Sequence, residues 1–190
     1  MKETRHAFLS RPIPAALFLL AFLIVAAAAA LAGARALADR AHLRTGDAQW
    51  IWLAVDLEEP RPVRFFARRD FTLASVPHSA KALLFVDRRG VLTVNTSRFP
   101  LPEQRPGSPL SVVEIAPALT AGVNRVVIEA ESPTGAGGIL FHLDLPGGEP
   151  VDSDATWRVG PSEAELARGA GTPAAVWGRP PMYPWRYPGK

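Results

Sequence analysis

The last part of the chain gathers side chains suited to holding a ligand or a protein partner. Residues 169–190 are rich in glycine and proline and carry six large aromatic or guanidinium side chains: Trp177, Arg179, Tyr183, Trp185, Arg186 and Tyr187. Flat rings serve as platforms for sugars, and Trp, Tyr and Arg anchor protein interfaces. We expect this segment to contact a partner protein, to contact a carbohydrate, or to close an open edge of its own domain.

Paired carboxylates are the second set of candidate groups. Residues 152–154 read Asp-Ser-Asp and resemble half of a calcium loop, but the rest of that loop pattern is missing. The pairs Glu58/Glu59 and Glu129/Glu131 have the residue type needed for glycoside cleavage. Their places, in a loop and at a strand end, favour solvated side chains instead. The sequence therefore predicts no metal site and no catalytic pair here.

Other chemistry has little support in the sequence. The chain has no cysteine, and its four histidines show no metal-ligand spacing. His142 falls in an apparent strand and is expected to be structural. No nucleophile elbow, phosphate-binding loop or dinucleotide fingerprint is present. We therefore expect neither a cofactor nor an enzymatic activity.

One long apolar run must position everything that follows it. Residues 13–34 contain no charged residue, and about 20 apolar residues suffice to cross a bilayer core. The sequence predicts a single transmembrane helix over 13–34, after a cytoplasmic N-terminus over 1–12. Its second half is rich in small residues, either as apolar filler or as a face that packs on another membrane helix; the candidates for that face are Ala26, Ala27, Ala30 and Gly33.

Charge and length refine this prediction. The run is longer than the apolar core of a cleavable signal peptide, which favours an uncleaved anchor, although two Ala-Leu-Ala sequences leave cleavage open. Lys and Arg are equally numerous on both flanks, and the free amino terminus favours an N-inside orientation. We expect a bacterial inner-membrane protein whose C-terminal domain is periplasmic or extracellular. Residues 1–44 carry a net charge of +4 and residues 45–190 carry −1, so nucleic-acid binding is not expected.

Residues beyond the apolar run read as an all-β domain. After a juxtamembrane linker over 35–47, alternating and β-branched segments recur every 8–15 residues, separated by turn residues. Residues 87–90, Asp-Arg-Arg-Gly, are expected to make a hairpin connection with Gly90 at positive φ. Residues 162–168 form the one candidate helix. We predict an antiparallel, jelly-roll-like β-sandwich over 48–160, followed by an extension over 161–190 whose Gly and Pro content argues against a strand ladder.

The order of motifs in this domain resembles a known family. The motifs are the Trp-Ile-Trp of 50–52, the FFARRDFTL of 65–73, the strand–turn–strand over 80–95, the VEIAPALTAG of 113–122 with Asn124, the Gly-Gly-Ile-Leu of 137–140 and the DATWR of 154–158. The series resembles the galactose-binding-like β-sandwich modules that precede the catalytic domains of bacterial α-L-rhamnosidases and related glycoside hydrolases. One departure is Thr96 after Asn95, where those modules have Gly.

The resemblance implies a fold and a setting rather than an activity. It carries over no catalytic residue, because these modules are not the catalytic part, and no catalytic barrel follows in the 190 residues. We expect a non-catalytic, membrane-anchored accessory subunit whose sandwich and C-terminal segment pack on partners in a larger envelope membrane complex. The alternative is a membrane-tethered carbohydrate-binding module.

Overall fold

A computed structural model describes residues 15–54 and 61–183, with backbone only for Ala15 and residues 37–43. It divides the chain into two units, Met1–Leu37 and Ala38–Lys190. The predicted N-terminus over 1–12 and the Glu58/Glu59 pair lie outside the described residues.

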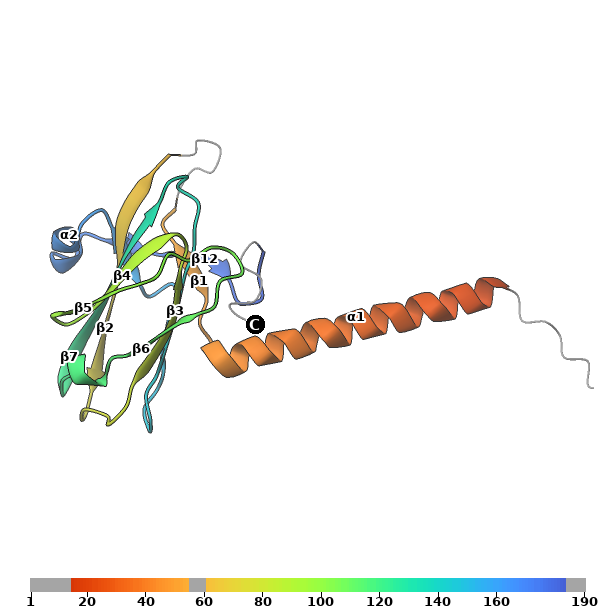
Figure 1. Ribbon diagram of the computed structural model, residues 1–190, viewed down its shortest axis with the longest axis horizontal. Coiled ribbons are helices and arrows are strands. Elements are labelled where there is room, and N and C mark those ends of the chain that lie inside the picture. The colour runs from red at the N-terminus through yellow and green to blue at the C-terminus, as the bar shows by residue number, and fades with distance from the viewer. Residues whose placement is uncertain (1–14, 55–60, 184–190) are drawn as a thin grey trace, which may run out of the picture. The chain divides into compact units, whose positions relative to one another are not determined.

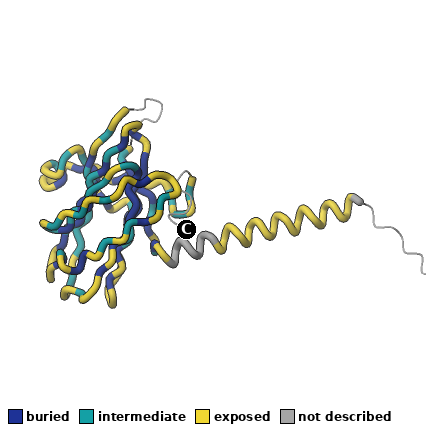
Figure 2. Tube along the Cα trace, in the orientation of Figure 1, coloured by how far each residue is buried: buried dark blue, intermediate teal, exposed yellow. Residues whose placement is uncertain are grey.

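The helix α1 (Ala15–Thr45) begins in the first unit and includes most of the predicted linker. Its stretch Ala16–Ala36, 21 residues long, is strongly apolar apart from Arg35 and is entirely exposed, as Figure 2 shows. By length and composition this stretch is able to cross a membrane, and a signal sequence has the same properties. The helix packing candidates Ala26, Ala27, Ala30 and Gly33 all lie on it, and their side chains touch nothing that buries them.

Two antiparallel sheets of six strands each form the second unit (Figure 1). The first sheet has the order β12 (Ala175–Gly178), β1 (Trp50–Trp52), β8 (Ile139–Asp144), β3 (Lys81–Val86) and β6 (Ser111–Glu114), with β9 (Val151–Asp152) also paired to β8. The second has the order β11 (Thr172–Pro173), β10 (Arg158–Gly160), β2 (Val63–Leu73), β7 (Gly122–Ser132), β4 (Arg89–Val94) and β5 (Ser97–Pro100). A 3₁₀ turn, η1 (Ala116–Ala118), and a short helix, α2 (Glu163–Ala167), complete the fold. The predicted sandwich is thus confirmed at the level of two packed antiparallel sheets.

The main core lies between the sheets because each strand alternates apolar residues toward its partner sheet. In β2, Phe65 and Ala67 are buried while their neighbours Arg64 and Arg68 face outward. The largest buried side chains in this layer include Trp52, Trp157, Phe141 and Ile128. Trp52 packs edge-on against Phe65, with ring centroids 4.7 Å apart.

A second, smaller apolar cluster lies apart from the main core and contains Trp50, Phe85 and Leu140, against which Met182 packs. The sequence predicts that Trp50 and Trp52, two residues apart, face the same side of their strand. Both rings are fully buried, but they enter different clusters, because the register of β1 shifts between Trp50 and Ile51. The C-terminal segment therefore packs on its own domain as far as Met182.

Two sequence expectations about connections are wrong. Residues 87–90 do not close a hairpin, because β3 belongs to one sheet and β4 to the other. Positive φ falls on Arg88, whose backbone N–H and C=O both bond to Gln104, and not on Gly90. Glycine is needed at position 90 for space instead, because a Cβ there would lie 2.8 Å from the Val86 side chain.

The C-terminal extension does form strands. β11 and β12 add one edge strand to each sheet. The prolines are compatible with this pairing because Pro173 lies in an edge strand and no proline lies within Ala175–Gly178. The candidate helix at 162–168 is confirmed as α2, capped by the Ser162 side chain, which accepts a hydrogen bond from the Glu165 N–H.

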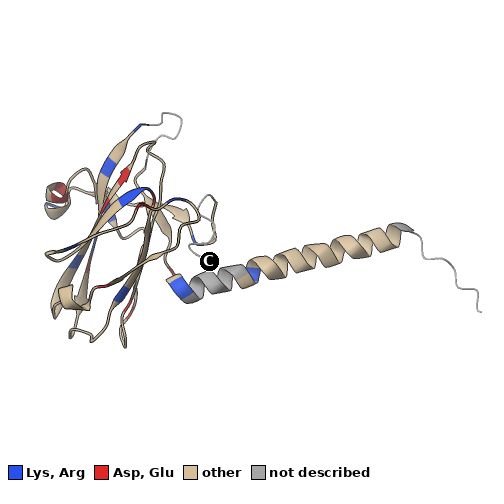
Figure 3. Cartoon of the chain, in the orientation of Figure 1, with Lys and Arg blue, Asp and Glu red and all other residues tan. Residues whose placement is uncertain are grey.

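Charged side chains cover the outer face of the β2–β7–β4 layer, where Figure 3 shows both signs on the strands. Asp70 accepts hydrogen bonds from Arg68 Nε at 2.9 Å and Arg125 Nε at 3.1 Å. The bond from Arg68, followed by that from Arg125, holds the pKa of Asp70 below its ordinary value. Glu129 and Glu131, once candidates for a catalytic pair, are both ion-paired with Arg64 on this face.

Two asparagines join η1 to the β4–β5 hairpin, and Asn95 Nδ2 donates to the Ala118 carbonyl at 2.8 Å. Asn124 is fully buried; its Oδ1 accepts from Asn95 Nδ2 and the Thr120 N–H, and its Nδ2 donates to the Thr120 carbonyl. Asn95 itself has φ +54°, a conformation that asparagine tolerates better than most residues. Thr96 itself is not at positive φ, so the hairpin does not need Gly in second place.

We expect Asn124→Ala to lower the free energy of unfolding by about 3 kcal/mol, because several buried donors and acceptors lose their partner at once. Urea unfolding of the full chain in detergent, followed by tryptophan fluorescence, measures this. Thr96→Ala, in the exposed turn of the same hairpin, is the control and should change stability by less than about 0.5 kcal/mol. Equal effects of the two substitutions would contradict the assignment.

The Asp70 ion pairs should make stability depend on pH in a defined direction. Because the pKa of Asp70 is lowered on folding, its contribution is complete above its ordinary value of 3.8 and is lost as the pH falls through the folded-state pKa. Asp70→Asn should therefore reduce the urea midpoint at pH 7, and the difference from the parent chain should shrink below pH 3.8. A difference that grows in acid would contradict this.

Candidate functional site

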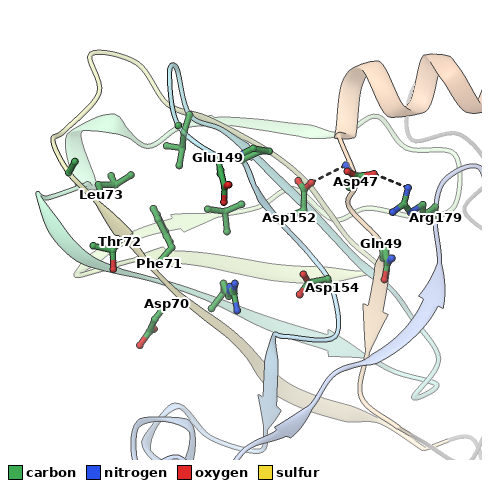
Figure 4. Close-up of a pocket in the computed structure, with 16 residues that line it drawn as sticks. Asp47, Gln49, Asp70, Phe71, Thr72, Leu73, Glu149, Asp152, Asp154 and Arg179 are labelled. Atoms are coloured by element: carbon green, nitrogen blue, oxygen red, sulfur yellow. Dashed lines mark hydrogen bonds and ion pairs between the residues drawn. The ribbon is translucent and has the colours of Figure 1, made fainter.

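A cleft of about 920 Å³ opens between the end of β2 and the connection from β8 to β9. We call it the β2–β9 cleft. It is lined by residues 69–74 on one side, by Leu145 and residues 148–152 on the other, and by Asp47, Gln49, Asp154 and Arg179. Figure 4 shows Asp70, Phe71 and Thr72 on one side and Asp47, Asp152 and Arg179 opposite them. Its size is that of ordinary small-ligand sites.

The cleft exists because β10 is shorter than the strand beside it. β10 pairs with β2 only at Phe66, Ala67 and Arg68, whereas β7 pairs with β2 along its whole length to Leu73. Just before β10 the chain turns: the Thr156 N–H bonds to Asp154 Oδ1 at 2.8 Å, and the Trp157 N–H bonds to the Asp154 carbonyl. The space beside residues 69–73 is therefore left without a neighbouring strand.

This missing strand leaves backbone groups of β2 open toward the cleft. The N–H and C=O of Arg125 bond to Asn95, on the β4 side of β7. In an antiparallel ladder the direction alternates, so Val126 and Asn124 face β2, opposite Arg69 and Phe71. The backbone N–H and C=O groups of Asp70 and Thr72 then point away from β7, toward the unpaired edge.

The opposite side of the cleft is held by a chain of polar contacts. Asp152 Oδ1 lies 2.6 Å from His142 Nδ1, and Asp152 Oδ2 accepts the Asp47 N–H at 2.9 Å. Asp47 is also ion-paired with Arg179 Nη1 at 2.8 Å. Gly46, with φ +53°, sits against His142, where a Cβ would lie 2.8 Å from the ring. These contacts fix the first residues after α1 to β8, β9 and the segment after β12.

The polar side chains of the cleft differ in how far they are already engaged. The carboxylates of Asp47, Asp152 and Asp154 all have partners within the protein. The side chains of Arg69 and Glu149 make no hydrogen bond or ion pair in the described part of the chain. The cleft thus offers one free cation and one free anion beside open backbone donors and acceptors, which suits a polar ligand with many hydroxyl groups.

Of the three predicted tail residues that the structure describes, one lines this cleft. Arg179 lines it, whereas Trp177 lies in the edge strand β12 with 37% of its surface exposed and Tyr183 is 79% exposed. Trp185, Arg186 and Tyr187 lie outside the described residues.

The calcium-loop interpretation of residues 152–154 is not supported. Asp152 and Asp154 are engaged by His142 and by the Thr156 turn. No group of three possible metal ligands occurs among the residues that the structure describes.

Sequence reasoning missed Arg69, Thr72 and Glu149 as candidate site residues. The sequence pattern could have indicated Arg69, because this charged residue occupies an inward position in the alternation of Phe65, Ala67, Phe71 and Leu73. A charged side chain at such a position is stable only if it has an ion-pair or hydrogen-bond partner or is reached by solvent. No sequence pattern indicated the cleft itself, since the cleft depends on the residue at which β10 begins.

Comparison with known proteins supports the fold. No family model and no curated protein matches the chain. Among solved structures, it is similar to the GH78 family rhamnosidase of Bacillus sp. GL1 with a TM-score of 0.63 and 21% identity, covering 76% of this chain and 20% of that one. The α-L-rhamnosidase of Streptomyces avermitilis, solved with L-rhamnose, gives 0.61 and 20%, covering 74% of this chain and 15% of that one.

A lectin gives a comparable match. The Pleurotus ostreatus lectin, solved in complex with GalNAc, matches with a TM-score of 0.60 and 20% identity, covering 73% of this chain and 44% of the lectin. The chain thus spans about a fifth or less of the rhamnosidases and under half of the lectin. At these identities the likeness concerns the fold, and the domain that the motifs predicted is a rhamnosidase-like β-sandwich module.

Proposed function

We propose that this chain is a non-catalytic saccharide-binding module, tethered to a bacterial inner membrane by its N-terminal helix, with the β2–β9 cleft as the binding site. The observation that carries the proposal is the cleft itself, in which backbone groups of Asp70 and Thr72 and the side chains of Arg69 and Glu149 lack partners in the described structure. Sugars are recognised through such mixed donors and acceptors, because each hydroxyl both donates and accepts.

The fold likeness agrees with this proposal. The similar parts of the rhamnosidases are a minor share of those enzymes, and the lectin is described in complex with the sugar GalNAc. The cleft also lacks a free pair of carboxylates, since Glu149 is its one unengaged acid among the described residues. Glycoside cleavage ordinarily needs two. A binding role is therefore the better account of these residues.

A blocking substitution tests the site. Ala74 is exposed and lines the cleft, so Ala74→Trp should fill it and reduce glycan binding by the full chain at least about tenfold. Ala121→Trp, in an exposed turn that does not line the cleft, is the matched control and should bind as the parent chain does. A glycan array probed with the chain in detergent identifies ligands, and titration calorimetry gives the affinities.

The proposal fails if no glycan on the array binds the parent chain. The site assignment alone fails if glycans bind and Ala74→Trp binds them as well as Ala121→Trp does. Unchanged thermal unfolding of both variants is required for either conclusion.

A second candidate function is the accessory subunit of an envelope membrane complex. The specific observation in its favour is the edge strand β12, where Val176 and Trp177 are 41% and 37% exposed on a strand paired only to β1. An open edge with apolar side chains is a place where another chain is able to add. The C-terminal residues beyond 183 and the small residues of α1 belong to the same proposal.

The edge of β12 provides the test of this second role. A mild-detergent pull-down of the tagged full chain should recover a stoichiometric membrane partner. Val176→Lys with Trp177→Lys should release it, because lysines on an edge strand oppose pairing. Val112→Lys on β6, the other edge strand of the same sheet, is the control and should retain the partner. A monodisperse chain without a partner would exclude the accessory role.

A further inference from the structure

Arg69 occupies an unusual position for a charged side chain. It follows Phe65 and Ala67 on the inward side of β2 and precedes Phe71 and Leu73, all of which belong to or pack against the main core. It is half-buried, and it lines the β2–β9 cleft. A guanidinium at such a place loses part of its hydration, which is costly unless a partner restores hydrogen bonds.

Neighbouring arginines on the same sheet have such partners, and Arg69 does not. Arg68 and Arg125 both bond to Asp70, and Arg64 is ion-paired with Glu129 and Glu131. All of these pairs lie on the outer face. The side chain of Arg69 makes no hydrogen bond or ion pair within the described residues. Its five N–H donors therefore remain available to a molecule that enters the cleft.

The acidic residues of the cleft do not form ion pairs with Arg69. Asp47 is ion-paired with Arg179, Asp152 is hydrogen-bonded to His142, and Asp154 caps its own turn. Glu149 is exposed and forms no ion pair with Arg69, so the two lie more than 4 Å apart. The carboxylates still give the cleft wall a negative field, which disfavours a ligand with several negative charges.

These observations select a ligand class, on the condition that the proposed saccharide binding holds. We infer that the ligand of the β2–β9 cleft is a saccharide bearing one carboxylate per bound ring, as a hexuronic acid does, and that Arg69 recognises that carboxylate. The planar guanidinium fork matches a carboxylate with two parallel hydrogen bonds, which an ammonium or an amide does not reproduce. Ring hydroxyls then meet the open backbone groups of Asp70 and Thr72.

Matched ligands and a charge-removing variant test this inference. The probes are glucuronate- and galacturonate-containing oligosaccharides and their carboxyl-reduced counterparts, which keep the ring and linkage but lose the charge. Titrated into the full chain in detergent, the acidic form should bind at least about tenfold more tightly than the reduced form. Arg69→Gln should remove that preference by weakening the acidic ligand alone, and Arg69→Lys should retain only part of it.

Two further variants sharpen the result. Arg89→Gln removes an exposed arginine that does not line the cleft, and it should leave both affinities unchanged. Glu149→Gln removes the free carboxylate of the cleft, and it should raise the affinity for the acidic ligand relative to that for the reduced one. Arg69 has no partner in the described structure, so Arg69→Gln should unfold at the same temperature as the parent chain.

The outcomes separate this inference from the proposed function. Binding of reduced and acidic ligands with equal affinity, or an equal loss of both in Arg69→Gln, overturns the role of Arg69 while saccharide binding stands. Binding of no oligosaccharide by the parent chain overturns saccharide binding and this inference together.

Discussion

Burial of Trp157 is the constraint on which the cleft depends. Its ring is fully buried between the sheets, 5.2 Å from the ring of Phe141, and its indole N–H donates to the Asp152 carbonyl at 2.9 Å. To reach this place the chain leaves the plane of β2 and β10 at the Asp154 turn. A large apolar side chain gains several kcal/mol by this burial, far more than one or two ladder hydrogen bonds would return. β10 therefore begins only at Arg158, and the edge of β2 stays open.

The same region joins the start and the end of the domain. The backbone carbonyl of Asp152 accepts the hydrogen bond from the Trp157 indole, and its carboxylate is hydrogen-bonded to His142 and to the Asp47 N–H. The Asp47 side chain is in turn ion-paired with Arg179. Ser153 adds to this joint, because its buried hydroxyl donates to the Gln49 carbonyl and accepts from the Phe141 N–H. Asp152 and Ser153 thus link β8 to the residues just before β1 and, through Asp47, to the segment after β12. Rigid walls of this kind reduce the entropy that a ligand must lose on binding.

The sequence predicted most of the fold because the fold follows from local patterns. Alternation over residues 63–73 predicts a strand there, which the structure shows as β2, and residues 162–168 were the one candidate helix, which the structure shows as α2. It did not predict the inter-sheet connection at residues 87–90, since the identity of each strand's partner is not a local property. It also undervalued β11 and β12, because edge strands tolerate the proline content that argues against interior strands. Both Arg179 and its ion-pair partner Asp47 line the cleft, but the sequence had indicated only Arg179 as a candidate contact residue.

Arg69 shows how a break in a local rule indicates a site. An inward arginine in an otherwise apolar alternation would be severely destabilising in a closed sandwich, where no water reaches it. It is tolerated here because β10 begins at Arg158, opposite Arg68, so no residue of β10 pairs with Arg69 and the guanidinium lies in the cleft and not in the core. The residue whose charge would be costly to bury is therefore also the residue at which the edge of β2 becomes unpaired. A fold under selection for stability alone would place an apolar residue there and extend β10, so the retained charge is most simply explained by what the cleft holds.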